Sequence, residues 1–218
     1  MNIENLTTEY DWLLFDFDGT LVDTGDGIIK AAHYGLLQMG IEENDPEKLR
    51  RFVGPPLTKA FQEYYGFSEE ESVQTVLEFR KYYTTQGWKE SSIYPGIHRM
   101  LQKLKAAGKH LCIATGKPEE LAVTISRRDN LLGYFDFIGG AYVDEEGEHR
   151  VMKPEVIEYV LENVGNPDRS GVIMIGDRAN DILGAKACNL KSIGALWGYG
   201  SYDELNNAGA DFFADSPI

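Results

Sequence analysis

Cysteine is scarce in this sequence, which contains Cys112 and Cys188 among its 218 residues. Both lie among apolar or small residues, so we expect two buried thiols in a reducing compartment, and neither a disulfide nor a metal site. The four histidines show no metal-ligand spacing. The sequence therefore argues against a disulfide-stabilised secreted domain and against a Cys/His zinc site.

Long apolar runs and an excess of basic residues are also missing. No stretch approaches membrane-spanning length, and the start, MNIENLTTEYDW, has neither the basic residues nor the apolar segment of a secretory signal. Asp and Glu outnumber Lys and Arg by 35 to 21, for a formal net charge of -14. This charge disfavours nucleic acid and anionic membranes as partners, whereas a cation inside one cleft would still admit a small anionic substrate. We expect a cytoplasmic enzyme or binding protein.

Short apolar runs that end in Gly, Asp or Thr recur along the chain. They are WLLFDFDG (12–19), HLCIATG (110–116), YFDFIGG (134–140), GVIMIGD (171–177), KSIGALWG (191–198) and ADFFAD (210–215). Near-continuous apolar runs are typical of strands covered on both faces. The segments between the later runs carry helical patterns, several of which begin after Pro or Asp and end at Gly or Asn. The alternation predicts an α/β fold with a doubly wound, Rossmann-like parallel sheet.

Residues 23–91 break this alternation. Three amphipathic helical patterns follow one another there with no credible strand among them. We interpret this block as an inserted all-helical cap domain and assign residues 1–22 and 92–218 to the α/β core domain. The joints, VDTGDG and KESSIYPG, are rich in small residues that can act as hinges.

Polar residues gather at the predicted strand ends, which is where doubly wound sheets bind ligands. The ends carry Asp16-Phe17-Asp18-Gly19-Thr20, then Thr115-Gly116-Lys117, then Asp177 with Asp181 one helical turn later, while Lys153 opens the helix before Asp177. The carboxylates and hydroxyls form a hard oxygen-ligand set that suits Mg²⁺ and leaves a position for a phosphate oxygen, with one lysine beside them.

Both acidic motifs also have a structural interpretation. Asp-Gly after an apolar run is a hairpin signal, and GDRAND could be an acidic first turn favoured by the helix dipole. Helical patterns follow the first motif where a hairpin would need a returning strand, which favours the catalytic interpretation. Lys117 is expected to be a solvated residue at a helix start.

Four segments, DFDGTLVD, IATGKP, KPEVIEYVL and GDRANDILGAKACN, resemble the four motifs of the haloacid-dehalogenase-like (HAD) hydrolases. Their order and the helical insertion after the first motif resemble the phosphoglycolate phosphatase-like branch, which has a small helical cap. The resemblance implies an Mg²⁺-dependent phosphatase that hydrolyses a small phosphate monoester, such as phosphoglycolate, a nucleotide or a sugar phosphate, through an aspartyl-phosphate. Relatives that cleave carbon–halogen bonds carry a non-acid at the position of Asp18, so its acid favours a phosphate monoester.

The resemblance also implies roles for individual residues. Asp16 would be the nucleophile, and Asp18 the general acid and then the general base. Mg²⁺ would be held by Asp16, Asp177 and the backbone carbonyl of Asp18, with Asp181 as a ligand or, preferably, a partner acting through water. Thr115 and Lys153 would contact the phosphoryl oxygens. The further substrate contacts would be Gly19, Thr20, Gly116 and, in the cap, Arg51.

Two other functions fit the same residues. A phosphosugar mutase uses this core but returns the phosphoryl group to a sugar. A phospho-acceptor signalling domain also carries an aspartate at a strand end. The helical insertion argues against the signalling domain, and so does Asp18, which would hasten loss of the phosphoryl group.

Overall fold

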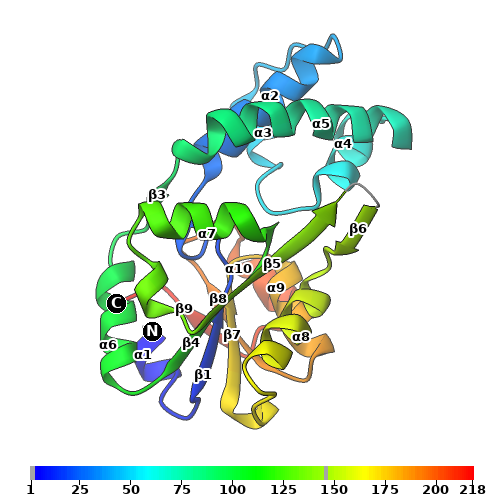
Figure 1. The fold of residues 1–218 in the computed structure, drawn as a ribbon. Helices are drawn as coiled ribbons and strands as arrows, with labels where there is room; N and C mark the ends of the chain where they lie inside the picture. The colour runs from blue at the N-terminus through cyan, green and yellow to red at the C-terminus, as the bar shows by residue number, and fades with distance from the viewer. Residues whose placement is uncertain (1–2, 145–146) are drawn as a thin grey trace. The chain divides into compact units, whose positions relative to one another are not determined.

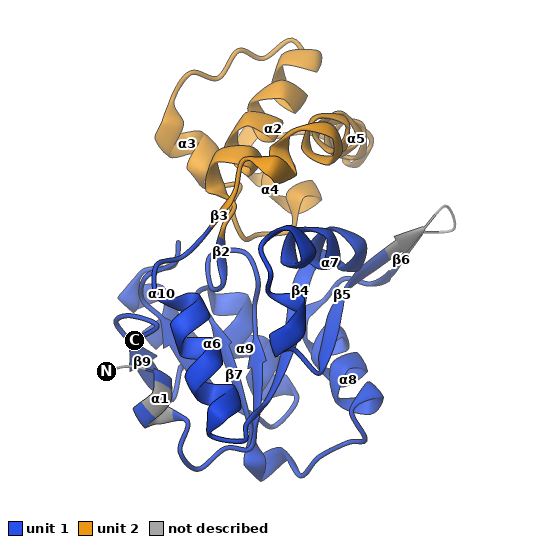
Figure 2. Cartoon of the chain, turned by 60° about the vertical axis from the view of Figure 1, so that its left-hand side comes forward, with its two compact units in different colours: residues 1–22, 93–218 blue, residues 23–92 orange. Residues whose placement is uncertain are grey.

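The computed structural model of this chain describes residues 3–144 and 147–218, which form two units (Figures 1 and 2). The first, which we call the α/β unit, takes the chain up to Val22 and again from Ile93 to Ile218. The second, the helical unit, takes Asp23–Ser92. The chain passes between them through β2 (Val22–Asp23) and β3 (Ser92–Ile93), which pair as a two-stranded sheet.

A seven-stranded sheet forms the centre of the α/β unit, in the order β6-β5-β4-β1-β7-β8-β9. Its strands are β1 (Trp12–Phe15), β4 (His110–Pro118), β5 (Phe137–Asp144), β6 (Gly147–Arg150), β7 (Val172–Gly176), β8 (Lys191–Ala195) and β9 (Phe212–Ala214). Neighbours are parallel except for β5 and β6, which are antiparallel. The predicted doubly wound sheet is confirmed, and each predicted apolar run overlaps one of its strands. The sequence did not predict β6, because this edge strand carries no apolar run.

β1 lies at the point where the strand order reverses. After β1 the chain adds β4 and β5 on one side, and later β7, β8 and β9 on the other. In the register, Leu14 of β1 pairs with Cys112 of β4 and with Met174 of β7. The carboxyl ends of three adjacent parallel strands therefore meet where such sheets bind ligands.

Helices cover the sheet on both sides (Figure 1). They are α1 (Ile3–Leu6), α6 (Ile97–Ala106), α7 (Glu119–Arg128), α8 (Lys153–Asn163), α9 (Ala179–Ala187) and α10 (Tyr202–Ala208), with short 3-10 turns η2 (Leu132–Tyr134) and η3 (Arg169–Gly171). One buried cluster joins Leu14 and Met174 of the sheet to Val156 and Val160 of α8. Because β1 is covered by helices, its residues must be apolar on both faces, which explains the unbroken run WLLF.

The helical unit consists of α2 (Gly25–Gln38), α3 (Pro46–Arg50), α4 (Leu57–Tyr65), α5 (Glu69–Thr85) and the turn η1 (Gly87–Lys89). The three predicted helical patterns correspond to α2, α4 and α5. α5 begins at a capping box in which the Ser68 side chain accepts from the N–H of Glu71 and the Glu71 side chain accepts from that of Ser68. α2 packs closely on α5 at Gly35, where an added Cβ would stand 3.0 Å from the carbonyl oxygen of Thr75. Among the described residues of both units, no helix combines the length and apolarity needed to cross a membrane.

Candidate active site

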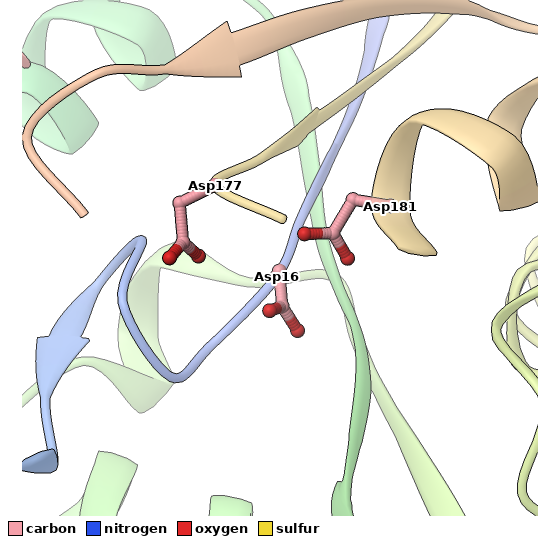
Figure 3. A group of neighbouring side chains, drawn as sticks. All are labelled: Asp16, Asp177 and Asp181. Atoms are coloured by element: carbon pink, nitrogen blue, oxygen red, sulfur yellow. The ribbon is translucent and has the colours of Figure 1, made fainter. Parts of the chain in front are cut away.

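Asp16 follows β1 directly and continues its pairing, since its N–H donates to the carbonyl of Ile175 in β7 at 2.8 Å. Its carboxylate is buried and faces those of Asp177 and Asp181 (Figure 3). One oxygen from each of the three carboxylates lies within 4.8 Å of the other two. Three buried like charges repel and lose their hydration, so this group needs positive charge to be stable.

Lys153 supplies one of the positive charges. It is the first residue of α8, and its Nζ lies 2.8 Å from Oδ1 of Asp16 and 2.7 Å from Oδ1 of Asp181. Burial alone would lower the pKa of Lys153, but the two carboxylates outweigh burial and raise this pKa above its usual value. Gly184 of α9 makes room for the lysine stem, because a Cβ there would stand 2.5 Å from Cγ of Lys153. The ammonium is thereby fixed between two of the three acids.

Asp181 is satisfied by groups of the chain. Its carboxylate contacts Lys153 and also accepts a hydrogen bond from the backbone N–H of Arg178 at 3.0 Å. Asp181 lies in the first turn of α9, where an acidic side chain commonly accepts such a bond. Burial, together with the charge of Asp16, raises the pKa of Asp181 to about 6. Gly176 is required beside it, since a Cβ there would stand 2.3 Å from Cγ of Asp181.

Asp177 differs from Asp16 and Asp181 because no ion pair within residues 3–144 and 147–218 includes it. Its Oδ1 accepts from the hydroxyl of Thr20 and its Oδ2 from the N–H of Tyr199, both at 2.9 Å. Complete burial, with the charges of Asp181 and Asp16, raises the pKa of Asp177 well above its usual value. Among the residues that the structure describes, the carboxylate of Asp177 therefore has two hydrogen-bond donors and no cation.

A divalent cation fits this charge balance. With the three acids ionised, three negative charges and the ammonium of Lys153 sum to −2. Carboxylate oxygens are the ligands that Mg²⁺ prefers. Asp181 has the ammonium of Lys153 as a cation, whereas Asp177 has no cation among the described residues. Asp16 shares that ammonium through Oδ1, so the residues that suit Mg²⁺ best are Asp16 and Asp177.

Asp18 has a different partner, Lys117, and the expectation that Lys117 is solvated is wrong. The Nζ of Lys117 lies 3.0 and 3.1 Å from the two carboxylate oxygens of Asp18, and the residue is only 6% exposed. The cause lies in β4, whose pairing with β5 shifts register between Ala114 and Pro118. In this irregular segment Lys117 lies buried against the Asp16–Thr20 turn.

The remaining predicted residues of the α/β unit lie around these acids. Thr115 is buried, and its hydroxyl oxygen accepts the N–H of Lys117 at 3.1 Å, whereas Gly116 is exposed. Gly19 has φ +84°, and its N–H donates to the carbonyl of Val22 at 2.9 Å. The hydroxyl of Thr20 is directed at Asp177. The strand-end residues thus come together as a group.

Two arginines have partners other than the three acids. Arg51 was predicted to contact the substrate, and Arg150 is a neighbour of Lys153 in the sequence. Arg51 belongs to the helical unit, where its guanidinium carbon lies 3.8 Å from the ring centroid of Tyr64. Arg150, which precedes Lys153 closely in sequence, pairs with Glu119 at 2.9 Å. Lys153, and not Arg150, therefore reaches the acids.

The sequence interpretation missed the residues Trp197–Gly200, which follow β8 and precede α10. The indole N–H of Trp197 donates to the carbonyl of Thr20 at 2.9 Å, and Tyr199 donates its N–H to Asp177. The available signal was the alternation of aromatic residues and glycine, WGYG, which begins at the end of the apolar run 191–198 and continues beyond it. Glycines at a strand end indicate close approach of another backbone.

Comparison with known proteins identifies the family. A family model described as haloacid dehalogenase-like hydrolase matches residues 13–195. A 5'-nucleotidase of Pseudomonas aeruginosa is 36% identical over 196 residues, which are 90% of this chain and 87% of that protein. A phosphoglycolate phosphatase of Aquifex aeolicus is 33% identical over 205 residues, 94% of this chain and 92% of that protein. The crystal structure of a predicted phosphatase from Clostridium acetobutylicum matches with a TM-score of 0.89 at 41% identity, covering 96% of this chain and 95% of that one. The chain therefore belongs to the haloacid dehalogenase-like hydrolase family.

Proposed function

We propose that this hydrolase is an Mg²⁺-dependent phosphatase that cleaves a small phosphate monoester through an aspartyl-phosphate on Asp16. The observation that carries the proposal is the charge arrangement at the strand ends: Lys153 is shared by Asp16 and Asp181, and Asp177 lacks a cation among the described residues. The relatives named as 5'-nucleotidase and phosphoglycolate phosphatase support a phosphate-ester substrate. The substrate class is therefore a nucleotide, a phosphoglycolate-like acid or a sugar phosphate.

In the first half-reaction, Asp16 attacks phosphorus. Lys153 holds Oδ1 of Asp16 at 2.8 Å, so the attack falls to Oδ2. A bond forms between Oδ2 and phosphorus while the bond from phosphorus to the leaving oxygen breaks, and Asp18 gives that oxygen a proton. Lys153 and the donors at Thr115 and Gly116 stabilise the charge that spreads over the phosphoryl oxygens.

In the second half-reaction, water replaces Asp16 on phosphorus. Asp18, now a carboxylate, takes a proton from the water as its oxygen bonds to phosphorus, and the bond to Oδ2 of Asp16 breaks. Lys117 contacts both oxygens of Asp18 and fixes the direction of this carboxyl group. The products are the alcohol and inorganic phosphate.

When bound at Asp16 and Asp177, Mg²⁺ supplies positive charge that lets an anionic carboxylate approach an anionic phosphate. We also propose that the backbone carbonyl of Asp18 is a third ligand from the chain. Asp181 acts on the site through its contact with Lys153.

We assign the helical unit the role of a cap that excludes water and selects the leaving group, with Arg51 as an anion contact. Under this proposal, Arg51→Ala raises KM for anionic leaving groups more than it lowers kcat. An unchanged KM for every active ester would remove Arg51 from the site.

The test is phosphate release from a panel of metabolite monoesters in Mg²⁺, with Asp16→Asn as the variant. Asp11→Asn is the matched control, because Asp11 precedes β1 at its other end and its side chain is 82% exposed. We expect Asp16→Asn to abolish turnover, Asp11→Asn to leave it unchanged, and EDTA to stop it until Mg²⁺ is restored. Phosphate release by Asp16→Asn at the parent rate would refute the nucleophile, and formation of an isomer without phosphate release would identify a mutase.

A further inference from the structure

The segment Trp197–Gly200, here called the WGYG loop, has no role in the chemistry proposed above. It comes from the end of β8, yet it lies against two sequence-distant parts of the site, Thr20 in the first motif and Asp177 after β7. Trp197 is separated from Thr20 by 177 positions. The loop therefore joins two strand-end segments that are covalently remote.

The contacts of the loop converge on one carboxylate. Oδ2 of Asp177 accepts the N–H of Tyr199 from the loop itself, and Oδ1 accepts the hydroxyl of Thr20. The Thr20 residue is in turn held by Trp197, whose Nε1–H donates to the Thr20 carbonyl at 2.9 Å. Both oxygens of Asp177 are thus oriented by groups that the loop supplies or holds.

Glycines allow the close approach. A Cβ at Gly198 would stand 2.3 Å from Cβ of Asp177 and 2.4 Å from the carbonyl oxygen of Gly19. A Cβ at Gly200 would stand 1.9 Å from the carbonyl oxygen of Asp177. Any side chain at either position would displace Asp177 or the turn at Gly19, so the loop fits this site only with glycine at positions 198 and 200.

We propose that the WGYG loop is a positioning element for the metal site, in which Trp197 acts through Thr20 to fix the carboxylate of Asp177. The inference rests on the Mg²⁺ site of the proposed function. Asp177 needs such fixation because, unlike Asp16 and Asp181, it has no ammonium to orient it among the described residues. Groups that orient a metal ligand typically change metal affinity about 10- to 100-fold when they are removed.

The experiment measures Mg²⁺ affinity by isothermal titration calorimetry on the full chain without substrate. Trp197→Phe removes the indole N–H but keeps an aromatic ring, and we expect the Mg²⁺ Kd to rise about tenfold, at the lower end of that range. Trp12→Phe is the matched control, because Trp12 stacks on His110 at the start of β1, away from the strand-end acids. Thr20→Val removes the hydroxyl that Asp177 accepts and should raise Kd about 10- to 100-fold, whereas Thr20→Ser keeps the hydroxyl and should stay near the parent value.

Each outcome decides the inference. A Trp197→Phe or Thr20→Val protein that binds Mg²⁺ with parent affinity overturns it, and so does an equal loss in Trp12→Phe. If Trp197→Phe does not fold, the Thr20→Val and Thr20→Ser pair carries the test alone.

Phosphate release is measured in parallel. If Mg²⁺ binding responds as expected but no ester releases phosphate, the result would refute the phosphatase proposal alone. An active phosphatase with unchanged Mg²⁺ affinity in every variant would refute the loop alone, and a parent chain that binds no Mg²⁺ would refute the loop together with the metal site.

Discussion

Replacing Lys153 with methionine removes the ammonium that Asp16 and Asp181 share and changes the charge of the group from −2 to −3. One more buried carboxylate must then take up a proton or remain charged without a partner. An aspartate in the unfolded chain has a pKa of about 3.9, which is roughly 3 pH units below pH 7. Keeping a proton on this carboxylate in the folded state at pH 7 costs about 1.4 kcal/mol for each of those units, or about 4 kcal/mol in total. Breaking a buried ion pair from one side costs a similar amount, about 3–5 kcal/mol. We therefore expect Lys153→Met to fold but to lose much of its stability.

The assay is thermal and urea unfolding in EDTA at pH 7 and pH 5. At pH 7 the expected loss lowers Tm by about 8–16 °C for a chain of this size. The sign of the pH effect follows from proton binding: the folded variant holds a proton that the unfolded chain releases above a pH of about 4, so its stability falls as pH rises. At pH 5 the loss should shrink to about 1.5 kcal/mol.

Two further variants separate charge from packing. Lys191→Met breaks the exposed pair with Asp211 and should change Tm little. The double variant Lys153→Met with Asp181→Asn returns the charge to −2 and should recover much of the stability lost by Lys153→Met. An equal loss at both pH values, or a double variant no more stable than the single one, would refute the charge argument.

Three other outcomes are expected. Burial raises the pKa of Asp181 to about 6 and also raises the pKa of Asp177 well above its usual value. Mg²⁺ binding should therefore release more protons at pH 6 than at pH 8, as calorimetry in buffers of different ionisation enthalpy measures, and equal release at both pH values would contradict this. Burial raises the pKa of Cys112 and of Cys188 to about 12. Neither thiol should therefore react with Ellman's reagent at pH 8 until the chain is unfolded in urea. Rapid labelling of the folded protein would contradict this, because it would show that at least one of the two thiols is accessible. Gly19→Ala should lose at least about 1 kcal/mol of stability, because φ at Gly19 is +84° and the added methyl group would meet the carboxylate of Asp177. If the variant unfolded at the same urea concentration as the parent protein, that result would contradict this geometry.

The positions of most strands along the chain could be anticipated because the evidence for them is local. A strand between two layers of helices must be apolar on both faces, so runs such as WLLF and VIMIG mark β1 and β7 in the sequence itself. Elements without such a requirement were missed. The edge strand β6 and the five-residue helix α3 carry few apolar residues, and β2 and β3 are two residues each.

The candidate acids could also be anticipated, since parallel strands that end together bring their following residues together. Asp16 and Asp177 follow β1 and β7, and the sequence interpretation grouped them because each follows a predicted strand. Lys153 was added to the group as the residue that opens the helix before β7.

Only the tertiary structure decided which charges are paired. Lys153 and Asp16 are 137 positions apart, and Lys117 and Asp18 are 99 apart, so neither pair leaves a local pattern. The irregular pairing of β4 places Lys117 against Asp18, and only the packing of the chain places the WGYG loop against Asp177. The sequence by itself determined the sheet and the set of acids, because apolar periodicity and strand ends are properties of neighbouring residues. The partner of each acid was decided by packing, because a distance between remote side chains exists only once the sheet, its irregularities and its loops are assembled.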